Sequence, residues 1–482
     1  MDQEKQSQSS CGVDILQRRI RWYHGLFIAM AVPVLVLPSI GYFALMIAAF
    51  SIVLWILNVI EGFFQCTGYA ELAATYPYAP GIPGANQEVW KKRSHFIGGF
   101  GAWGYWFAWN PVISINALLG GWYLQSILFP GQTDLAPILS IAFFIFMGFI
   151  LLATSYFGVV AGSYTQLAIV ILSLGPLLGI SASAYITGQF RLENITNWWL
   201  PEGWNWFSLE AWLIFLGLMA LAEWSSCAWE CAATYSAEYK DPKRDVPLAL
   251  MAAGGLCLFT YPFVQAACIG SLGADILSEE NYVNPLTPIA IHSFGQIGGL
   301  ISIVMMLSAL ILISNTALLG SSRALYSLAR NYQVPVQLSK LNKHNSPFRS
   351  AVVTYLFNFT LLLVGISYGG ALPIWILSAS AVGYLFINGL VNIAFVLSRK
   401  DIPYDDPRRT WKAPRFWVYI AAFWGIVNLT VYQVGLAYVM GEALGVVLGY
   451  LVMLLFIGLY YWGRHQMKKS GVKLDDLKPI EM

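Results

Sequence analysis

The chain has few charged side chains. Only 11% of its 482 residues are Asp, Glu, Lys or Arg, and 57% are hydrophobic, whereas ordinary soluble domains carry about 25% charged residues. So few charges cannot cover a surface that faces water. The composition excludes an ordinary soluble protein and predicts that a lipid bilayer surrounds most of the chain.

Histidine and cysteine are also scarce, and neither is spaced for chemistry. The five histidines are scattered without metal-ligand spacing, and H-E-x-x-H, G-x-S-x-G, Gly-rich phosphate loops and nucleic-acid signatures are absent. The sequence therefore predicts no metal, no cofactor, no nucleic-acid partner and no enzymatic activity. The six cysteines indicate packing residues rather than a disulfide framework; they are Cys11, Cys66, Cys227, Cys231, Cys257 and Cys268.

Long apolar runs, by contrast, recur through the whole chain. A bilayer core about 30 Å thick is crossed by a helix of about 20 apolar residues, and such stretches repeat from near Trp22 to near Trp462. The sequence predicts an all-α membrane protein with about twelve transmembrane helices. They cover residues 22–45, 47–73, 97–126, 137–156, 159–187, 209–235, 248–272, 293–328, 350–368, 370–397, 415–439 and 443–463.

The basic residues fall in alternate connections between these spans. If the N-terminus is inside, the outer connections hold only Arg191. This is the asymmetry that places basic loops in the cytoplasm, and it predicts that both termini are cytoplasmic. A plasma membrane and an inner bacterial or archaeal membrane both remain open. The inner connections hold Lys91, Lys92, Arg93, Lys240, Lys243, Arg244, Arg330, Lys340, Lys343, Arg349, Arg399, Lys400, Arg408, Arg409, Lys412, Arg415, Arg464, Lys468, Lys469, Lys473 and Lys478.

Two of the predicted spans are interrupted. The first carries Pro33 and Pro38, and a proline inside a helix removes a hydrogen bond and clashes with the preceding turn. The sixth carries Ser225-Ser226-Cys227-Ala228 between two acid-bearing halves. Either feature alone is also compatible with an ordinary kinked membrane helix.

Taken together, the positions of the two interruptions indicate an internal repeat. The spans lie five apart and run in opposite directions, as an inverted five-plus-five repeat predicts. Unwound segments of this kind meet near the midplane, where free backbone groups can hold a small charged solute. The prediction is a transport core over 15–397, with repeats 15–187 and 209–397, and two appended helices in 415–463. The polar ends, 1–14 and 468–482, are predicted as a disordered cytoplasmic N-terminus and a cytoplasmic tail.

Three acids fall at membrane depth, where each ionisable group costs roughly 2.5–3.5 kcal/mol on insertion scales. Glu223 and Glu230 flank the interruption of the sixth span and are candidates for a proton carrier or a counter-charge to a cation. The alternative is that they anchor the loosened backbone by hydrogen bonds. Glu61, inside the second span, fits a structural partner better. The nearby Trp109 and Trp224 fit packing, or cation-π contact with an amine.

Three motifs resemble the amino acid-polyamine-organocation (APC) superfamily of permeases. Tyr69-Ala-Glu-Leu-Ala-Ala-Thr-Tyr-Pro77 is similar to its Y-A-E-L-A-x-x-x-P signature, and Glu238-Tyr-Lys-Asp-Pro-Lys-Arg-Asp-Val-Pro247 to its E-x-x-x-P-x-R-x-x-P element. The third lies at Ser314-Asn315, Gly320–Arg330 and Pro335. They occur in the family's order over a matching pattern of spans.

The resemblance implies the leucine-transporter (LeuT) fold, and a symporter or exchanger of amino acids or related amines that works by alternating access. It also implies that Trp224 gates the site and that Glu230 is the acid just beyond the second interruption. Glu230 and Glu223 are the candidates for coupling transport to a proton. The substrate-binding positions that it implies are Ala31, Val32, Pro33, Val34, Ala108, Trp109, Trp224, Ser225, Ser226, Cys227, Ala228 and Asn315.

The chain departs from the family pattern at two functional positions. The usual G-x-G of the first interruption is Ala31-Val-Pro33 here, and proline removes one donor for a substrate carboxylate. The lysine that many members carry in span 5 is absent, with Ser173 in its place, which leaves Glu230, Glu223, a sodium ion or no coupling. A permease for amines such as polyamines, and a non-transporting receptor on the same fold, are the alternatives.

Overall fold

The structure is a computed structural model that describes residues 16–474 and 477, apart from 283, 369–371 and 440–443. The predicted disordered segment 1–14, with Cys11, lies outside the described residues. So do residues 475, 476 and 478–482 of the predicted tail.

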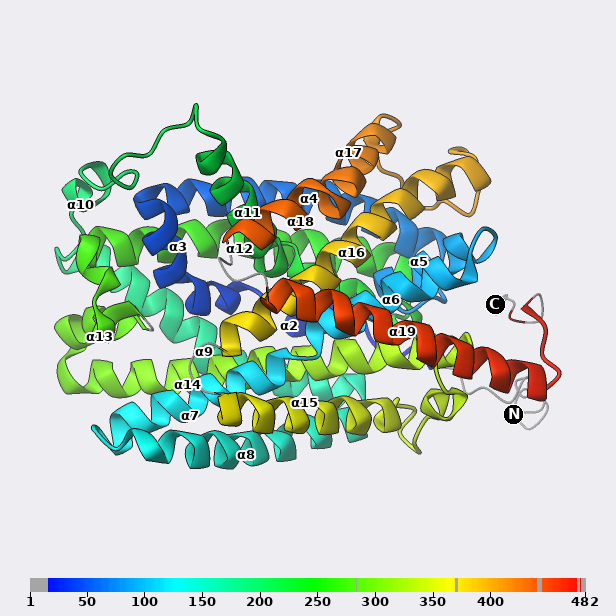
Figure 1. Ribbon diagram of the computed structural model, residues 1–482, viewed down its shortest axis with the longest axis horizontal. Coiled ribbons are helices and arrows are strands. Elements are labelled where there is room, and N and C mark those ends of the chain that lie inside the picture. The colour runs from blue at the N-terminus through cyan, green and yellow to red at the C-terminus, as the bar shows by residue number, and fades with distance from the viewer. Residues whose placement is uncertain (1–15, 283, 369–371, 440–443, 475–476, 478–482) are drawn as a thin grey trace.

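The described part of the chain is helical, and its one β-type contact is an isolated parallel bridge between Ile20 and Tyr239. Short 3₁₀ helices interrupt or join several α-helices (Figure 1). In chain order the elements are α2 (Trp22–Ala29), η1 (Pro33–Ser39), α3 (Ile40–Ile47), η2 (Ala48–Phe50), α4 (Ser51–Thr75), α5 (Gly81–Lys91), α6 (His95–Trp109), α7 (Val112–Leu128), η3 (Thr133–Leu135), α8 (Ala136–Phe157), α9 (Val159–Ile186), α10 (Leu192–Thr196), α11 (Leu209–Ser226), η4 (Ala228–Glu238), α12 (Pro242–Leu272), η5 (Gly273–Leu277), α13 (Glu279–Tyr282), α14 (Leu286–Arg330), η6 (Val336–Ser339), α15 (Phe348–Tyr368), α16 (Leu372–Asp401), α17 (Trp417–Leu429), α18 (Val431–Val439) and α19 (Leu444–Lys469).

Among the described residues, 10 helical segments are long and apolar enough to cross a membrane. The first of them, Trp22–Thr75, has 54 residues and includes both of the first two predicted spans. The predicted span 97–126 is divided between α6 and α7, which have 15 and 17 residues and meet at Asn110 and Pro111. These two places account for the difference from the predicted count of about twelve.

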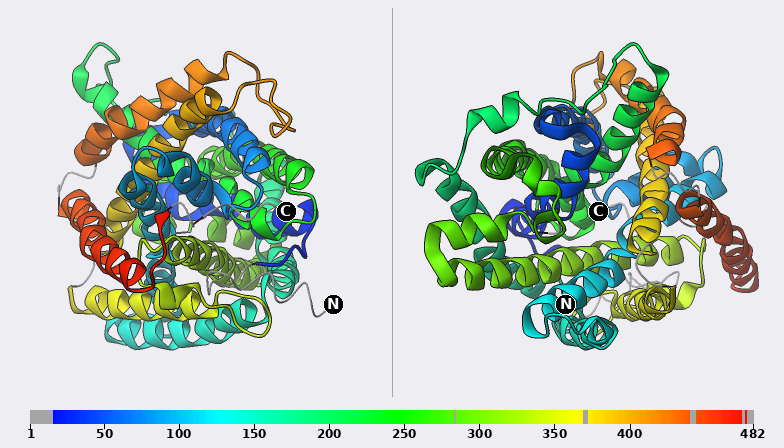
Figure 2. Two further views of the ribbon diagram at one scale, coloured as in Figure 1. Left: turned by 90° about the vertical axis from the view of Figure 1, so that its right-hand side faces the viewer. Right: turned by 60° about the vertical axis from the view of Figure 1, so that its left-hand side comes forward.

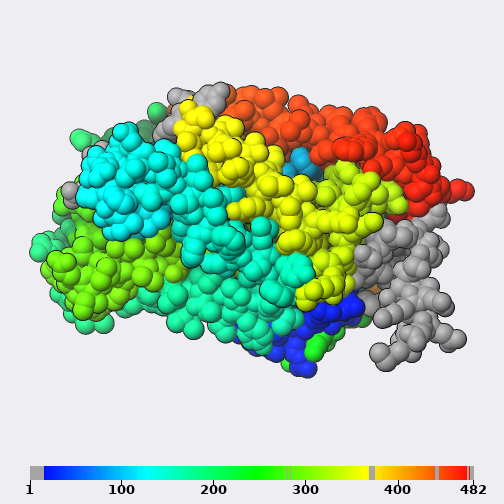
Figure 3. Space-filling model, turned by 90° about the horizontal axis from the view of Figure 1, so that it is seen from below, coloured from blue at the N-terminus to red at the C-terminus, as the bar shows by residue number. Residues whose placement is uncertain are grey.

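The outside of the bundle is apolar. On α8, Phe149 exposes 73% of its surface and Ile138 63%, and on α19 Leu455 exposes 60%. Figure 3 shows α8 in blue-green, α15 in yellow and α19 in red forming parts of one continuous face. A helical protein with this much exposed hydrophobic surface is solvated by lipid, because water would penalise such a patch.

The long helices pack along one another. α4 packs on α12, α9 on α14, and α6 on both α14 and α16. α7, α8 and α15 lie together along the lower side of the view in Figure 1. In both views of Figure 2, α19, in red, lies at the edge of the bundle.

The two ends of the bundle differ in charge. At the basic end, Arg93 forms an ion pair with Asp401 at 2.6 Å, the Arg19 backbone N–H bonds to Glu238 O, and Val336 N–H bonds to Gln466 Oε1. At the other end, marked by α10 and α13 in Figure 1, Ala49 N–H bonds to Trp198 O and Arg191 N–H to Gly270 O. Each of the three contacts at the basic end joins two basic segments that lie far apart in the sequence.

Residues of the three motifs form buried ion pairs at the basic end. Glu71 of the first motif is fully buried and is paired with Arg399 and with Arg409, at 2.6 Å from Arg409 Nη1. Glu238 of the second motif is paired with Arg323 of the third at 2.5 Å. Both pairs join helices that are distant in sequence.

The connection after the first motif forms a helix that the sequence analysis did not predict, α5. Its first residue, Gly81, has φ +65°, and a Cβ there would lie 2.4 Å from the Thr234 Cα atom. Only glycine fits this contact between α5 and η4.

Candidate functional site

The first span changes its helical form at the residues that carry the prolines. α2 ends at Ala29, and the 3₁₀ helix η1 begins at Pro33; residues 30–32 between them are called the first break here. Carbonyl groups around this break accept hydrogen bonds from side chains. Thr316 Oγ1 donates to Ile28 O at 3.1 Å, and Tyr261 OH donates to Val32 O at 2.7 Å.

The sixth span changes in the same way. α11 ends at Ser226, and the 3₁₀ helix η4 begins at Ala228; Cys227, between them, is called the second break. Ser225 O, one turn before η4, lies 2.9 Å from Tyr261 OH. One hydroxyl group of α12 therefore lies within hydrogen-bond distance of a carbonyl group at each break.

Tyr261 contacts both breaks and is a candidate site residue that the sequence analysis missed. It is fully buried in α12, and its ring lies 4.6 Å from that of Trp55. A tyrosine in an apolar helix gives no sequence signal beyond packing, because its role depends on two breaks that lie far from it in the chain.

Glu230 lies immediately after the second break and faces α6. It is fully buried. Its Oε1 atom accepts a hydrogen bond from Trp109 Nε1 at 3.2 Å, and its Oε2 atom accepts one from Tyr105 OH at 3.2 Å. Tyr105 OH also lies 2.6 Å from Thr234 Oγ1. The carboxyl group is therefore held by two aromatic donors of one helix.

Trp224 joins this group from the other side of the second break. Its Nε1 donates to Ala108 O at 3.2 Å, and its ring centroid lies 6.2 Å from that of Trp109. The structure thus brings together four residues that the sequence singled out: Ala108, Trp109, Trp224 and Glu230.

Glu223 faces away from this group. Its Oε1 atom accepts hydrogen bonds from Gln65 Nε2 at 2.8 Å and from Asn388 Nδ2 at 2.9 Å. Ser226 donates to Asn58 Oδ1 on the same side. The two acids that flank the break therefore accept hydrogen bonds from different donors, amide groups of α4 and α16 for Glu223 and aromatic side chains of α6 for Glu230.

Asn315 also lies apart from the Glu230 group. Its Oδ1 accepts a hydrogen bond from Thr154 Oγ1 at 2.6 Å, and its Nδ2 donates to Gln166 Oε1 at 3.1 Å. These bonds tie α14 to α8 and α9. Its neighbour Thr316, which bonds to Ile28 O, is the residue of this pair that reaches the first break.

The predicted substrate-binding residues are buried without exception. Trp224 exposes 7% of its surface, Ser225 3% and Trp109 2%. Cys227 packs with its Sγ atom 3.8 Å from Cys66 Sγ. The others are Ala31, Val32, Pro33, Val34, Ala108, Ser226, Ala228 and Asn315.

The acids of this region have neutral partners. In the described part of the chain, no lysine, arginine or histidine forms a hydrogen bond or an ion pair with Glu61, Glu223 or Glu230. Nor do the described residues include a cluster of three or more His, Cys, Asp or Glu that could hold a metal ion. A buried carboxylate without a cation is unfavourable, so the site favours a proton or a positively charged solute.

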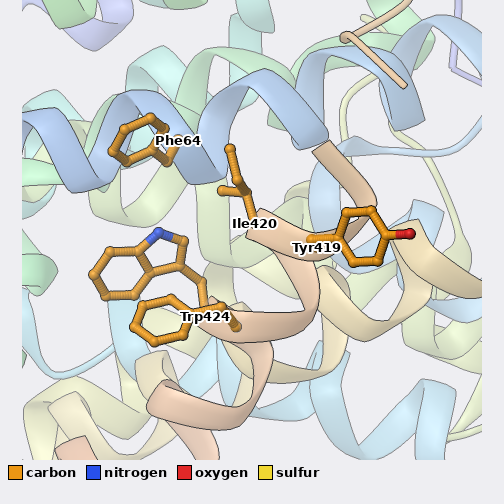
Figure 4. A pocket seen from close by; sticks show the side chains of 5 residues that line it. Phe64, Tyr419, Ile420 and Trp424 are labelled. Atoms are coloured by element: carbon orange, nitrogen blue, oxygen red, sulfur yellow. The ribbon is translucent and has the colours of Figure 1, made fainter. Parts of the chain in front are cut away.

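A separate pocket of about 340 Å³ lies at the surface between α4 and α17 (Figure 4). Phe64 of α4 lines one side, and the rest of the lining belongs to α17: Tyr419, Ile420, Phe423 and Trp424. None of the predicted site residues is among them. This aromatic, outward-facing pocket therefore has no part in the site at the breaks.

The apolar helices and the polar site buried among them define a multi-pass membrane protein. The sequence profile of amino acid permeases matches residues 25–458, and the chain belongs to this family. The predicted membership of the APC superfamily is thereby confirmed, and the family consists of transporters rather than enzymes.

Named relatives are distant and similar over most of their length. The chain is 24% identical to the amino-acid permease AapA of Bacillus subtilis, over 65% of this chain and 66% of the relative. It is 23% identical to a D-serine/D-alanine/glycine transporter of Escherichia coli O6:H1, over 68% and 70%. It is also 24% identical to the lysine-specific permease LysP of Escherichia coli K12, over 72% of each chain.

Proposed function

We propose that this protein moves amino acids across a membrane as a secondary active transporter, either a symporter or an exchanger. The family membership and the names of the relatives support the substrate class. The observation that carries the proposal is the pair of breaks, which share Tyr261 and lie beside the buried Glu230.

We infer a LeuT-type fold of twelve transmembrane helices for this function. The repeats would be 15–187 and 209–397, with the helices of 415–463 appended. The contacts support a two-fold relation between the halves, because elements of the first half pack on their counterparts in the second. These contacts are α2 with η4, α4 with α12, α6 with α14, and α8 with α15.

The substrate would bind at the two breaks, against α6. The backbone of residues 31–34 and 225–228 would supply polar groups, and Ala108 and Trp109 would form a wall. Asn315 would support this wall through its bonds to α8 and α9. Because all these residues are buried, a substrate reaches them only if the helices move, which is the reason for proposing alternating access.

Glu230 would couple transport to a proton, and Trp224 would gate the site. Glu230 lies in the first turn of η4, so a change in its charge would act next to the place where the α-helix changes to a 3₁₀ helix. Trp224 contacts both Ala108 and Trp109, so a rotation of its ring would open or close that wall. Glu223 would instead act on the contact of α11 with α4 and α16, which supply its hydrogen-bond donors.

A permease for amines without a carboxylate is the second candidate. Pro33 takes away one backbone donor at the first break, and three buried acids lack a basic partner among the described residues. Both features favour a cationic solute. A receptor that binds without transporting is the third candidate.

Counterflow in proteoliposomes tests these candidates. Vesicles are loaded with an unlabelled zwitterionic, cationic or acidic amino acid or with putrescine, and uptake of the same labelled solute is followed beside protein-free vesicles. Uptake driven by one class of amino acid supports the proposal. Uptake with putrescine alone favours the amine permease. Binding of labelled solute without counterflow, by protein that elutes as one folded species, favours the receptor.

A further inference from the structure

A second group of buried acids lies between α4, α11 and the C-terminal helices. We propose that Glu61 and Glu223 form a proton-binding site that is separate from Glu230 and in which the two carboxyl groups together bind one proton, carried by Glu223. This site goes beyond the proposed function, because its existence does not depend on which solute is carried.

One amide group joins the two acids. Gln65 Nε2 donates to Glu61 Oε1 at 3.1 Å and to Glu223 Oε1 at 2.8 Å. Both acids are buried, with exposed fractions of 2% and 0%. Two carboxyl oxygens that share one donor nitrogen are close enough for each charge to act on the other.

The remaining donors are neutral. Glu61 Oε2 accepts hydrogen bonds from Tyr432 OH at 2.7 Å and from Asn58 Nδ2 at 3.4 Å. Glu223 Oε1 accepts a second bond, from Asn388 Nδ2, at 2.9 Å. The donors come from α4, α16 and α18, so the pair is enclosed by four helices, counting α11, which carries Glu223.

Other titratable groups face the pair, and in the part of the chain that the structure describes none of them is a base that would be positive at neutral pH. Helix α4 presents Cys66 and Tyr69, and the second break presents Cys227. Helix α18 presents Tyr432. If both carboxyl groups were ionised, two negative charges would lie close together with no positive charge beside them. One bound proton leaves a single negative charge, which amide and phenol donors surround.

Two buried acceptors indicate where this proton lies. Glu223 Oε2 has no hydrogen-bond partner among the described residues, and neither has Asn428 Oδ1. The two side chains interact with each other. A proton on Glu223 Oε2 would turn this unpartnered oxygen into a donor, and Asn428 Oδ1 is the free acceptor of a side chain that interacts with Glu223. Both oxygens of Glu61, in contrast, already accept bonds, as an ionised carboxylate does.

The position of the pair connects it to the second break. Glu223 O accepts the bond from Cys227 N–H that ends α11, and Ser226 bonds to Asn58 of the same network. The proton on Glu223 therefore strengthens the attachment of α11 to α17, through Asn428. Its loss would weaken that attachment at the end of the interrupted helix.

Infrared spectroscopy of the full chain in lipid nanodiscs tests the site directly. The C=O stretching band of protonated carboxyl groups at neutral pH, and its shift in D₂O, are compared between the wild type and the variants Glu61→Gln and Glu223→Gln. We expect Glu223→Gln to remove one band that the matched control Glu202→Gln, in an exposed loop, retains. Glu230→Gln should leave that band in place, since the two sites are separate.

A second variant covers the case in which Glu223→Gln does not fold. Asn428→Leu removes the acceptor of the proposed proton, so the band should move to higher frequency. A spectrum that stays unchanged in Asn428→Leu and in folded Glu223→Gln would overturn the proposal. Stabilisation of the wild type, but not of Glu223→Gln, by sodium chloride relative to choline chloride would overturn it as well, in favour of a sodium site.

Discussion

Glu223 and Glu230 differ in their partners although only seven positions separate them. In an unbroken helix this spacing would place both side chains on one face. Instead, Glu230 accepts bonds from two aromatic residues of α6, and Glu223 from amides of α4 and α16. Each acid can therefore be altered without removing the hydrogen bonds of the other.

We predict that Glu230→Gln flattens the pH dependence of uptake. Glutamine keeps the size of the side chain and loses the titrating group, so transport no longer follows protonation at this position. The measurement is initial uptake in proteoliposomes over a range of pH values, together with thermal unfolding to establish that the variant is folded.

Glu202→Gln, the same change in an exposed loop, serves as the control and should keep the wild-type profile. If Glu230→Gln kept the wild-type pH profile and changed only the KM, Glu230 would act as a counter-charge to the substrate and the coupling role would be wrong.

Tyr261→Phe tests the contact that the two breaks share. The change removes the one hydroxyl group that donates to Val32 O and lies 2.9 Å from Ser225 O, and a buried polar group that loses its partner costs about 1–3 kcal/mol. We expect a lower unfolding temperature and weaker substrate binding, measured by thermal unfolding with and without substrate.

Tyr185→Phe is the matched control for this variant. Its hydroxyl also donates to a carbonyl, Phe263 O, at 3.1 Å, but the side chain is 38% exposed, so other donors can replace it. If both variants lost the same amount of thermal stability and substrate binding, the contact of Tyr261 with the two breaks would contribute no more than an ordinary tyrosine hydrogen bond.

At the scale of elements, buried ion pairs join the ends of helices. Arg409 is fully buried and bonds to Glu71, to Ser398 O at 2.6 Å and to Ile402 O at 2.9 Å. Its neighbour Arg408 is exposed, and its side chain lowers the pKa of Asp406 by hydrogen bonding. Adjacent arginines thus have opposite surroundings.

We predict that Arg409→Gln destabilises the protein by roughly 3–5 kcal/mol, because it removes one of the two positive charges that pair with the buried carboxylate of Glu71. Arg408→Gln, one residue away, should unfold like the wild type, since water replaces an exposed partner. Denaturant unfolding in detergent micelles compares the two. Similar losses in both variants would argue against a structural role for the Glu71 pairs.

At the scale of the whole molecule, the basic connections gather at one end. Contacts such as Arg93 with Asp401 and Val336 with Gln466 hold this end together, and α10 and α13 lie at the other. With basic loops inside, we propose that both termini are cytoplasmic and that the protein lies in a plasma membrane or an inner membrane.

Cysteine labelling measures this orientation. The cysteines among the described residues are free and buried, so after Cys11→Ser an added cysteine at an exposed position dominates the reaction. We expect a membrane-impermeant maleimide to label Glu202→Cys but not Lys92→Cys in intact cells, and both after permeabilisation. Labelling of Lys92→Cys alone in intact cells would reverse the topology.

Much of the helical framework could be predicted from the sequence. α8, α9 and α12 lie close to the predicted spans, because a helix in lipid must bond its own backbone and be apolar along its length. α5 was missed because its residues are mixed in polarity, and its start depends on the contact of Gly81 with Thr234. The division of span 97–126 at Pro111 was missed too, although proline is its local signal.

The sequence by itself determined that the chain is helical, lies in a membrane and belongs to the amino acid permeases, because composition, span length and short motifs are local properties. Only the tertiary structure decided which residues meet. It joined both breaks through Tyr261, turned Glu223 and Glu230 toward different helices, and bonded Asn315 to α8 and α9. These contacts depend on the packing of helices that are distant in sequence, and a buried polar group bonds to whichever donor that packing brings near.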